Sequence, residues 1–165
     1  MAVNYATVTW DQLHRDARIL AEALVPKMPF KGVVAVTRGG LIPAAIIARE
    51  LNCRLVETIS VVTYDEEERG KPTIIKSPDA AGDGEGFLVI DDLVDSGVTA
   101  RVVRERLPKA YFACLYAKPA GMKLTNHFVV EVPQDTWVLF PWDTAPLFVP
   151  PLATKAMDKA ENKAD

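Results

Sequence analysis

Three carboxylates and two hydroxyls lie close together between residues 91 and 99, directly after an apolar run. Residues 87–99 read Phe-Leu-Val-Ile-Asp-Asp-Leu-Val-Asp-Ser-Gly-Val-Thr. Neighbouring carboxylates repel each other unless they meet a cation or sugar hydroxyls. A Ser-Gly-x-Thr turn that opens a helix presents N–H groups and hydroxyls to an anion, and its glycine allows a close approach. The segment therefore predicts a ligand with phosphate and hydroxyl groups, bound together with a hard divalent metal.

The alternative interpretation is that these aspartates form only a solvated acidic turn before a helix. A single aspartate would mean no more than that, but Asp91, Asp92 and Asp95 fall within five positions. The segment lacks both the G-x-x-x-x-G-K-[ST] order and the G-x-G-x-x-G order of the common nucleotide-binding motifs. The pattern thus favours an anion site of a different kind.

Strands and helices alternate around this segment. Apolar β-branched runs predict strands at residues 33–37, 54–64, 87–91, 110–117, 128–132 and 137–140. Helical spacing and capping residues predict helices at 9–24, 41–52 and 97–107. This alternation indicates an α/β fold with a mostly parallel sheet covered on both faces, whose ligands bind at the carboxyl ends of the strands.

The long segment 65–85 breaks the pattern. It contains seven acidic and three basic residues, together with Pro72 and Pro78. Loops of this length inside a compact domain are usually functional or mobile. We therefore expect a flexible loop here. The proline-rich segment 141–151 is expected to be an ordered but irregular arm.

Length and charge limit the possible classes. The 165 residues predict one domain, with a polar tail after it, and the net charge of −3 argues against a nucleic-acid partner. No apolar run approaches the roughly 18 residues of a membrane span, and no secretory signal is visible. Cys53 and Cys114 form no metal motif, so we expect a cytoplasmic protein with two buried free thiols.

The motif at 89–99 resembles the phosphoribosyl pyrophosphate (PRPP) motif of the type I phosphoribosyltransferases. Other segments are similar to the purine branch of this family that acts on xanthine and guanine: 35–41, 82–96, 117–121, 133–137, 141–143 and 148–151. The resemblance covers about residues 5–151. It implies the type I fold, with a small hood of short strands, as a single domain over 1–152 with a flexible catalytic loop at about 65–85 and a tail at 153–165.

The resemblance also implies roles in PRPP binding. Asp91 and Asp92 would bind ribose hydroxyls and Mg²⁺, with Asp92 the better metal ligand, and Asp95 would act as general acid or base near N7 of the purine. The implied PRPP-binding residues are Arg38, Gly39, Arg69, Asp91, Asp92, Asp95, Ser96, Gly97, Val98 and Thr99. Arg69 would reach the pyrophosphate from the loop, and a cis peptide bond is implied at Thr37–Arg38. Val98 stands where the family has glycine, and we expect it to have an ordinary φ.

For the purine, the resemblance implies contacts from Asp95, Lys118, Trp137, Val138 and Asp143. Lys118 would donate to the 6-oxo group, which selects oxopurines over aminopurines. Trp137 would stack on the base, and Val138 would offer main-chain contacts near the 2-position.

The implied activity is purine salvage, in which the 5-phosphoribosyl group of PRPP moves to N9 of guanine, xanthine or hypoxanthine and pyrophosphate leaves. The sequence does not rank the three bases. One alternative is a hypoxanthine-preferring enzyme, and another is a non-catalytic regulator that senses PRPP. By resemblance the chain is a homotetramer in the cytoplasm, with peripheral association with the inner membrane face left open.

Overall fold

The computed structural model describes residues 4–63 and 72–143. These residues divide into two compact units. The central unit covers 11–134, and the terminal unit joins the segment up to Trp10 with the segment from Asp135 onward.

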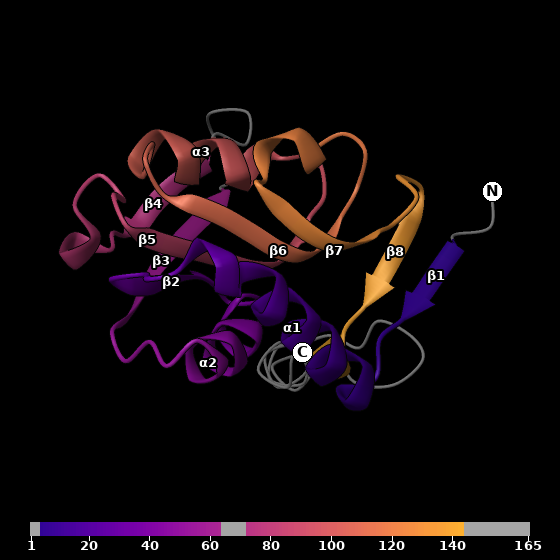
Figure 1. Ribbon diagram of the computed structural model, residues 1–165. Helices are drawn as coiled ribbons and strands as arrows, with labels where there is room; N and C mark the ends of the chain where they lie inside the picture. Colours follow the sequence, from indigo (N-terminus) through magenta and orange to yellow (C-terminus); the bar gives the residue numbers. More distant parts are fainter. Residues whose placement is uncertain (1–3, 64–71, 144–165) are drawn as a thin grey trace, which may run out of the picture. The chain divides into compact units, whose positions relative to one another are not determined.

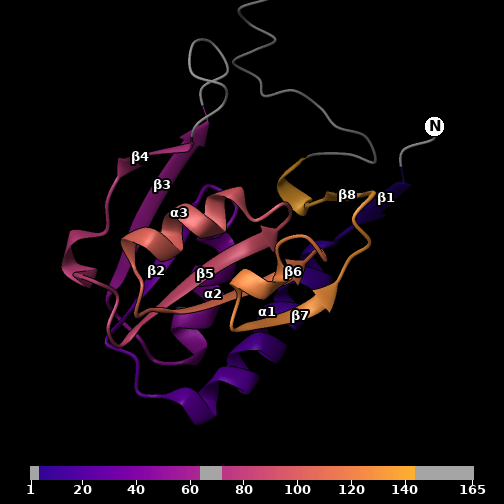
Figure 2. The same cartoon turned by 90° about the horizontal axis from the view of Figure 1, so that it is seen from above.

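A six-stranded sheet forms the core of the central unit, in the order β4-β3-β2-β5-β6-β7 (Figures 1 and 2). Its strands are β2 (Gly32–Thr37), β3 (Val56–Thr63), β4 (Pro72–Lys76), β5 (Phe87–Val94), β6 (Tyr111–Ala117) and β7 (His127–Glu131). All neighbours pair in parallel except β3 and β4, which are antiparallel. The predicted α/β class and the mostly parallel sheet are confirmed.

Helices cover both faces of this sheet. Figure 1 shows α1 (Trp10–Leu24) and α2 (Leu41–Glu50) on one side and α3 (Val98–Arg106) on the other. The apolar positions of α1 are buried because they recur on one helical face: Leu13, Ala17, Leu20 and Leu24. Pro26 follows, and the chain continues as the short 3-10 helix η1 (Val25–Lys27). No helix among the described residues is long and apolar enough to cross a membrane.

The prediction of a continuous loop over 65–85 is wrong for the part of this segment that the structure describes. Residues 72–76 form β4 on the edge of the sheet, and η2 (Asp79–Ala81) is a turn of 3-10 helix. The prolines and charges of this segment suggested a loop, but Thr73 and Ile74 pair with Val62 and Val61 of β3. Proline is tolerated on an edge strand, which explains Pro72 at the first position of β4. Residues 64–71 lie outside the described part.

The structure differs from the sequence-based predictions in three smaller features. Strand β5 runs through the acidic residues as far as Val94, instead of ending at Asp91. Helix α2 ends at Glu50, and Asn52 beyond it has φ 51°. Cys114 is buried as predicted, whereas Cys53 is only partly buried.

The terminal unit holds a small parallel sheet of two strands, β1 (Asn4–Thr7) and β8 (Thr136–Leu139). Asn4 donates to the carboxylate of Asp135 at 3.2 Å. The rings of Phe140 and Trp142 stack with centroids 4.8 Å apart, and η4 (Pro141–Asp143) is a 3-10 turn. Strand β8 matches the strand predicted at 137–140, whereas β1 was not predicted from the sequence. The remainder of the predicted arm and the tail lie outside the described residues.

Candidate active site

A cleft of about 240 Å³ opens at the carboxyl ends of β2 and β5, where α3 begins. Parallel strands end at the same edge of their sheet, so segments distant in sequence meet here. The lining residues are Val36, Thr37, Gly39, Val61, Asp91, Asp92, Leu93, Val94, Asp95, Ser96, Gly97, Val98, Thr99 and Ala100. The predicted PRPP motif and the predicted pyrophosphate loop are thus brought together by the fold.

Asp91 and Asp92 have different surroundings although they are adjacent. The Asp91 side chain is buried and accepts a hydrogen bond from the N–H of Asp92 at 2.9 Å. Burial, and then the charge of Asp92, raise the pKa of Asp91 well above its usual value. Asp92 is partly buried and accepts from the N–H of Leu93 at 2.7 Å. A cation bound beside this pair would favour its charged form.

The acidic pair fits Mg²⁺. This ion prefers oxygen ligands and keeps several of its sites for water and substrate oxygens, so two protein carboxylates are sufficient. Among residues 4–63 and 72–143 no group of three or more metal-binding side chains gathers. Two carboxylates are too few for a closed metal cage, so they would hold the ion only together with water or substrate oxygens.

The turn after β5 presents the start of α3 to the cleft. Gly97 is the N-cap residue of α3, with φ 82° in the left-handed region that favours glycine. Because glycine has no side chain, the cap residue does not compete for the first N–H groups of the helix. Val98 begins the helix and is not among the positive-φ residues of the described chain, as expected. Ser96 is exposed and Thr99 partly buried.

The loop that follows β2 lies directly against Asp92 of the acidic pair. The Thr37 hydroxyl donates to the Ser60 hydroxyl of β3 at 2.7 Å, and the implied cis peptide bond at Thr37–Arg38 is present. A Cβ atom on Gly39 would collide with the carboxylate of Asp92. Glycine is therefore required where this loop passes Asp92. Arg38 is exposed and is not one of the residues that line the cleft.

Asp95 pairs with Lys118, which comes from the end of the neighbouring strand β6. The Lys118 ammonium donates to Asp95 Oδ2 at 2.7 Å. The Lys118 side chain is 6% exposed and that of Asp95 is 51% exposed. The other oxygen, Asp95 Oδ1, accepts from the Gln134 amide at 2.8 Å. Sequence reasoning missed Gln134, because a glutamine in a turn carries no signal of its own.

The remaining predicted residues are not among the described residues of the central unit. Trp137, Val138 and Asp143 belong to the terminal unit. There Trp137 is 53% exposed, Val138 is buried, and Asp143 accepts from the N–H of Phe140 at 2.8 Å. Arg69 lies outside the described residues.

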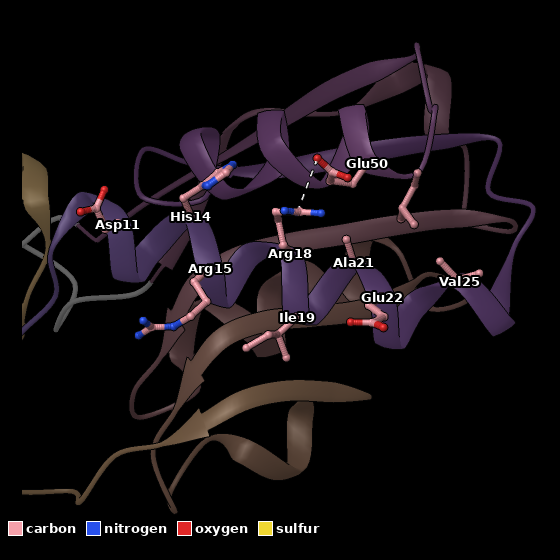
Figure 3. A pocket seen from close by; sticks show the side chains of 10 residues that line it. Asp11, His14, Arg15, Arg18, Ile19, Ala21, Glu22, Val25 and Glu50 are labelled. Carbon is pink, nitrogen blue, oxygen red and sulfur yellow. Dashed lines mark ion pairs between the residues drawn. The ribbon is translucent and has the colours of Figure 1, made fainter.

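A second hollow, of about 590 Å³, is lined by residues of α1 and of the end of α2 (Figure 3). It shares no lining residue with the cleft. Arg18 on α1 faces Glu50 on α2, with N and O 4.0 Å apart. Its charged lining residues have both signs: Asp11, Glu22 and Glu50 are acidic, and Arg15 and Arg18 are basic.

The acidic pair, the turn at the start of α3 and the Gly39 loop thus lie together at the carboxyl edge of a mostly parallel sheet, where α/β proteins bind their ligands. The family model "Phosphoribosyl transferase domain" matches residues 9–148. The chain belongs to this family, and the predicted family and fold are confirmed.

Comparison with individual proteins indicates which branch of the phosphoribosyltransferase family the chain resembles. The chain is 71% identical over 153 residues to a xanthine-guanine phosphoribosyltransferase of Gluconobacter oxydans, covering 91% of each chain. It is 57% identical over 146 residues to the protein of that name from Desulfotalea psychrophila, covering 88% of this chain and 90% of the relative. A crystal structure of a purine phosphoribosyltransferase from Pyrococcus horikoshii superposes with TM-score 0.76 at 30% identity, covering 90% of this chain and 99% of the other. The sequence-based prediction of a purine phosphoribosyltransferase agrees with all three.

Proposed function

We propose that the chain transfers the 5-phosphoribosyl group of PRPP to N9 of guanine, xanthine or hypoxanthine in purine salvage. The bond between C1′ and the pyrophosphate oxygen breaks, the bond from N9 to C1′ forms, and pyrophosphate leaves. The observation that carries this proposal is the cleft at the carboxyl edge, where Gly39, the acidic pair and the start of α3 meet. Its residues match the chemistry of a ribose that bears a phosphate at C5′ and a pyrophosphate at C1′.

Different groups of residues bind different parts of PRPP. The first N–H groups of α3 and the hydroxyls of Ser96 and Thr99 hold the 5′-phosphate. Asp91 and Asp92 hold the ribose hydroxyls, and Arg38, Gly39 and, from outside the described part, Arg69 hold the pyrophosphate. Asp92 and Asp91 would hold Mg²⁺, which would supply positive charge to stabilise the departing pyrophosphate. The carboxylates also favour the positive charge that develops on the ribose ring.

Asp95 and Lys118 act on the base. Asp95 accepts the proton that the purine loses, at N7, as N9 bonds to the sugar. Lys118 donates to the 6-oxo group, and this contact rejects adenine because an amino group offers no acceptor there. Trp137, Val138 and Asp143 are proposed as further purine contacts, on the strength of the sequence resemblance alone.

The test is an ultraviolet assay with PRPP, Mg²⁺ and one base at a time: guanine, xanthine, hypoxanthine or adenine. We expect nucleotide from the three oxopurines and none from adenine. A strong preference for hypoxanthine would favour the alternative enzyme. PRPP binding without turnover of any base would favour a regulator, and conversion of adenine alone would contradict the role of Lys118.

The stacking role of Trp137 is tested separately. Trp137→Ala should weaken purine binding roughly tenfold in calorimetry, since base stacking on an aromatic ring contributes about 1–3 kcal/mol, and should leave PRPP binding unchanged. Trp137→Phe is the matched control and should retain most of the affinity. Unchanged base affinity in the alanine variant would rule out stacking.

The assembly, the location and the domain limits are also proposals. The proposed assembly is a homotetramer. The proposed location is the cytoplasm, with peripheral membrane association as the alternative. The proposed domain is a single functional domain over 1–152, followed by a tail at 153–165. Light scattering of the native protein gives the oligomeric state. Removal of residues 153–165 should leave turnover unchanged if the tail lies outside the enzyme domain.

A further inference from the structure

Gln134 makes hydrogen bonds with both ends of its side-chain amide. Its Nε2 donates to Asp95 Oδ1 at 2.8 Å, and its Oε1 accepts from the backbone N–H of Ala120 at 2.9 Å. The two contacts fix the orientation of the amide. If the amide were reversed, its oxygen would face a carboxylate and its NH₂ group would face an N–H donor.

The partner segments are themselves joined to Asp95. The N–H of Lys118 donates to the carbonyl of Val94 at 2.9 Å, and the N–H of Gly121 donates to the carbonyl of Lys118 at 3.0 Å. A Cβ on Gly121 would lie 2.6 Å from the carbonyl oxygen of Asp95. The turn 118–121 therefore lies directly against the backbone of Asp95. Gln134 links this turn to the Asp95 side chain.

The Asp95 carboxylate is thus held at both oxygens. Lys118 occupies one lone pair of Oδ2, and Gln134 occupies one lone pair of Oδ1. Each oxygen retains a second lone pair for a proton. Since Asp95 is half exposed, solvent alone would not restrict the rotation of its side chain. These two donors are the described contacts that do so.

We propose that Gln134 is a positioning residue that keeps the Asp95 carboxylate aligned for proton transfer. Under the proposed function, on which this inference rests, Lys118 must also serve the 6-oxo group of the purine. Its ammonium is then shared between two acceptors. Gln134 is the donor that continues to hold Asp95 while Lys118 engages the base.

The test is a double-mutant cycle on turnover. Gln134→Leu keeps the approximate size of the side chain and removes both hydrogen bonds. In the wild-type background we expect kcat to fall about tenfold, the order expected for one hydrogen bond to a charged group. The KM for PRPP should change less than about twofold, because the hydrogen bonds of the Gln134 amide go to Asp95 and Ala120 and not to residues 96–99. In the Asp95→Asn background, measured by single turnover, the same change should reduce the rate less than about twofold.

Two further variants complete the test. Gln134→Glu offers a carboxylate to Asp95 in place of a donor, so its kcat at neutral pH should be no higher than that of Gln134→Leu. Asp135→Asn, one residue along the chain, is the matched control and should leave kcat unchanged. An equal loss in the wild-type and Asp95→Asn backgrounds, or a loss that falls on the KM for PRPP, would overturn the proposal. If the unmodified protein turns over no base, the proposed function fails; if it is active and Gln134→Leu is equally active, only this inference fails.

Discussion

Asp91 and Asp95 lie on the same short segment, yet their surroundings suit them to different tasks. Asp91 is buried beside Asp92, and its raised pKa reflects lost hydration and a neighbouring like charge. Asp95 is half exposed and accepts hydrogen bonds from Lys118 and Gln134. The first arrangement suits a group that meets a cation and sugar hydroxyls. The second suits a group that exchanges a proton with a ligand.

Replacing Asp95 separates chemistry from binding. Asp95→Asn should lower kcat about 100-fold or more, because general acid–base catalysis typically contributes at least that factor. The Kd for PRPP should remain within a few-fold, as measured by calorimetry with Mg²⁺ present. Asp92→Asn is the comparison and should mainly weaken PRPP binding. Equal losses of turnover and PRPP affinity in Asp95→Asn would mean that the role of Asp95 is only positional.

Gly39 is a second residue whose change has a defined result. Gly39→Ala places a methyl group against the Asp92 carboxylate, so the loop or the carboxylate must move. We expect PRPP affinity to fall about tenfold or more, in line with the roughly 1–3 kcal/mol of an overpacked site. Gly82→Ala is the control: its Cβ meets nothing within 4 Å, but its φ of 56° disfavours alanine. That variant should lose about 1 kcal/mol of stability and no PRPP affinity.

At the scale of elements, a side-chain hydrogen bond joins α1 to β6. The Tyr116 hydroxyl donates to the buried carboxylate of Asp16 at 2.6 Å, across 100 positions of sequence. Tyr116 stands two residues before Lys118. This hydrogen bond therefore connects a helix on one face of the sheet to the strand that delivers a proposed purine contact.

Tyr116→Phe tests this connection. It leaves the Asp16 carboxylate buried without its phenol donor and should reduce the free energy of unfolding by about 1–3 kcal/mol at pH 7. Burial, and then the hydrogen bond to Asp16, raise the pKa of Tyr116. The unfolded phenol ionises first, near its ordinary value of about 10. The stability that the hydrogen bond contributes is therefore present below that pH and declines as pH rises above it.

Urea unfolding at pH 7 and at pH 11 measures both effects. The difference between wild type and Tyr116→Phe should be smaller at pH 11 than at pH 7. Tyr111→Phe, at the start of the same strand, is the matched control and should cost less at pH 7. An identical pH dependence in Tyr116→Phe and wild type would show that this phenol does not contribute to alkaline unfolding.

At the scale of the whole molecule, net charge and ligand charge have to be considered together. The chain carries a net charge of −3, and its proposed substrate is strongly anionic. Under the proposed function, local positive charge would come from the N–H groups at the start of α3, from Arg38 and Arg69, and from a metal held by the aspartates. Net charge argues against a long polyanion and says little about a small one bound at one edge of a sheet.

Binding of Mg²⁺ and PRPP should raise the free energy of unfolding of the protein. With Mg²⁺ and PRPP at about 100 times Kd, linkage adds about 2.7 kcal/mol to the free energy of unfolding. For a domain of this size that corresponds to a rise in Tm of roughly 5–10 °C. Scanning calorimetry measures the rise, and excess EDTA should remove most of it. An unchanged rise in EDTA would contradict a metal requirement.

The sequence alone determined the class of fold, most of the strands and helices, and the segments that line the cleft. These features depend on local patterns. Apolar β-branched runs form buried strands, helical spacing forms α1 and α3, and the motif at 89–99 is contiguous, so its chemistry can be inferred without knowing its neighbours. Edge strand β4 was missed because pairing with β3 overcame its prolines and charges.

Only the tertiary structure decided which side chains meet across long separations and how deeply each is buried. The partners of Asp95 come from 23 and 39 positions away, and that of Tyr116 from 100. The difference between buried Asp91 and half-exposed Asp95 likewise follows from the path of β5 through the sheet. Hydrogen bonding and desolvation act between atoms that are close in space, and that closeness is created when the strands pair and the helices cover them.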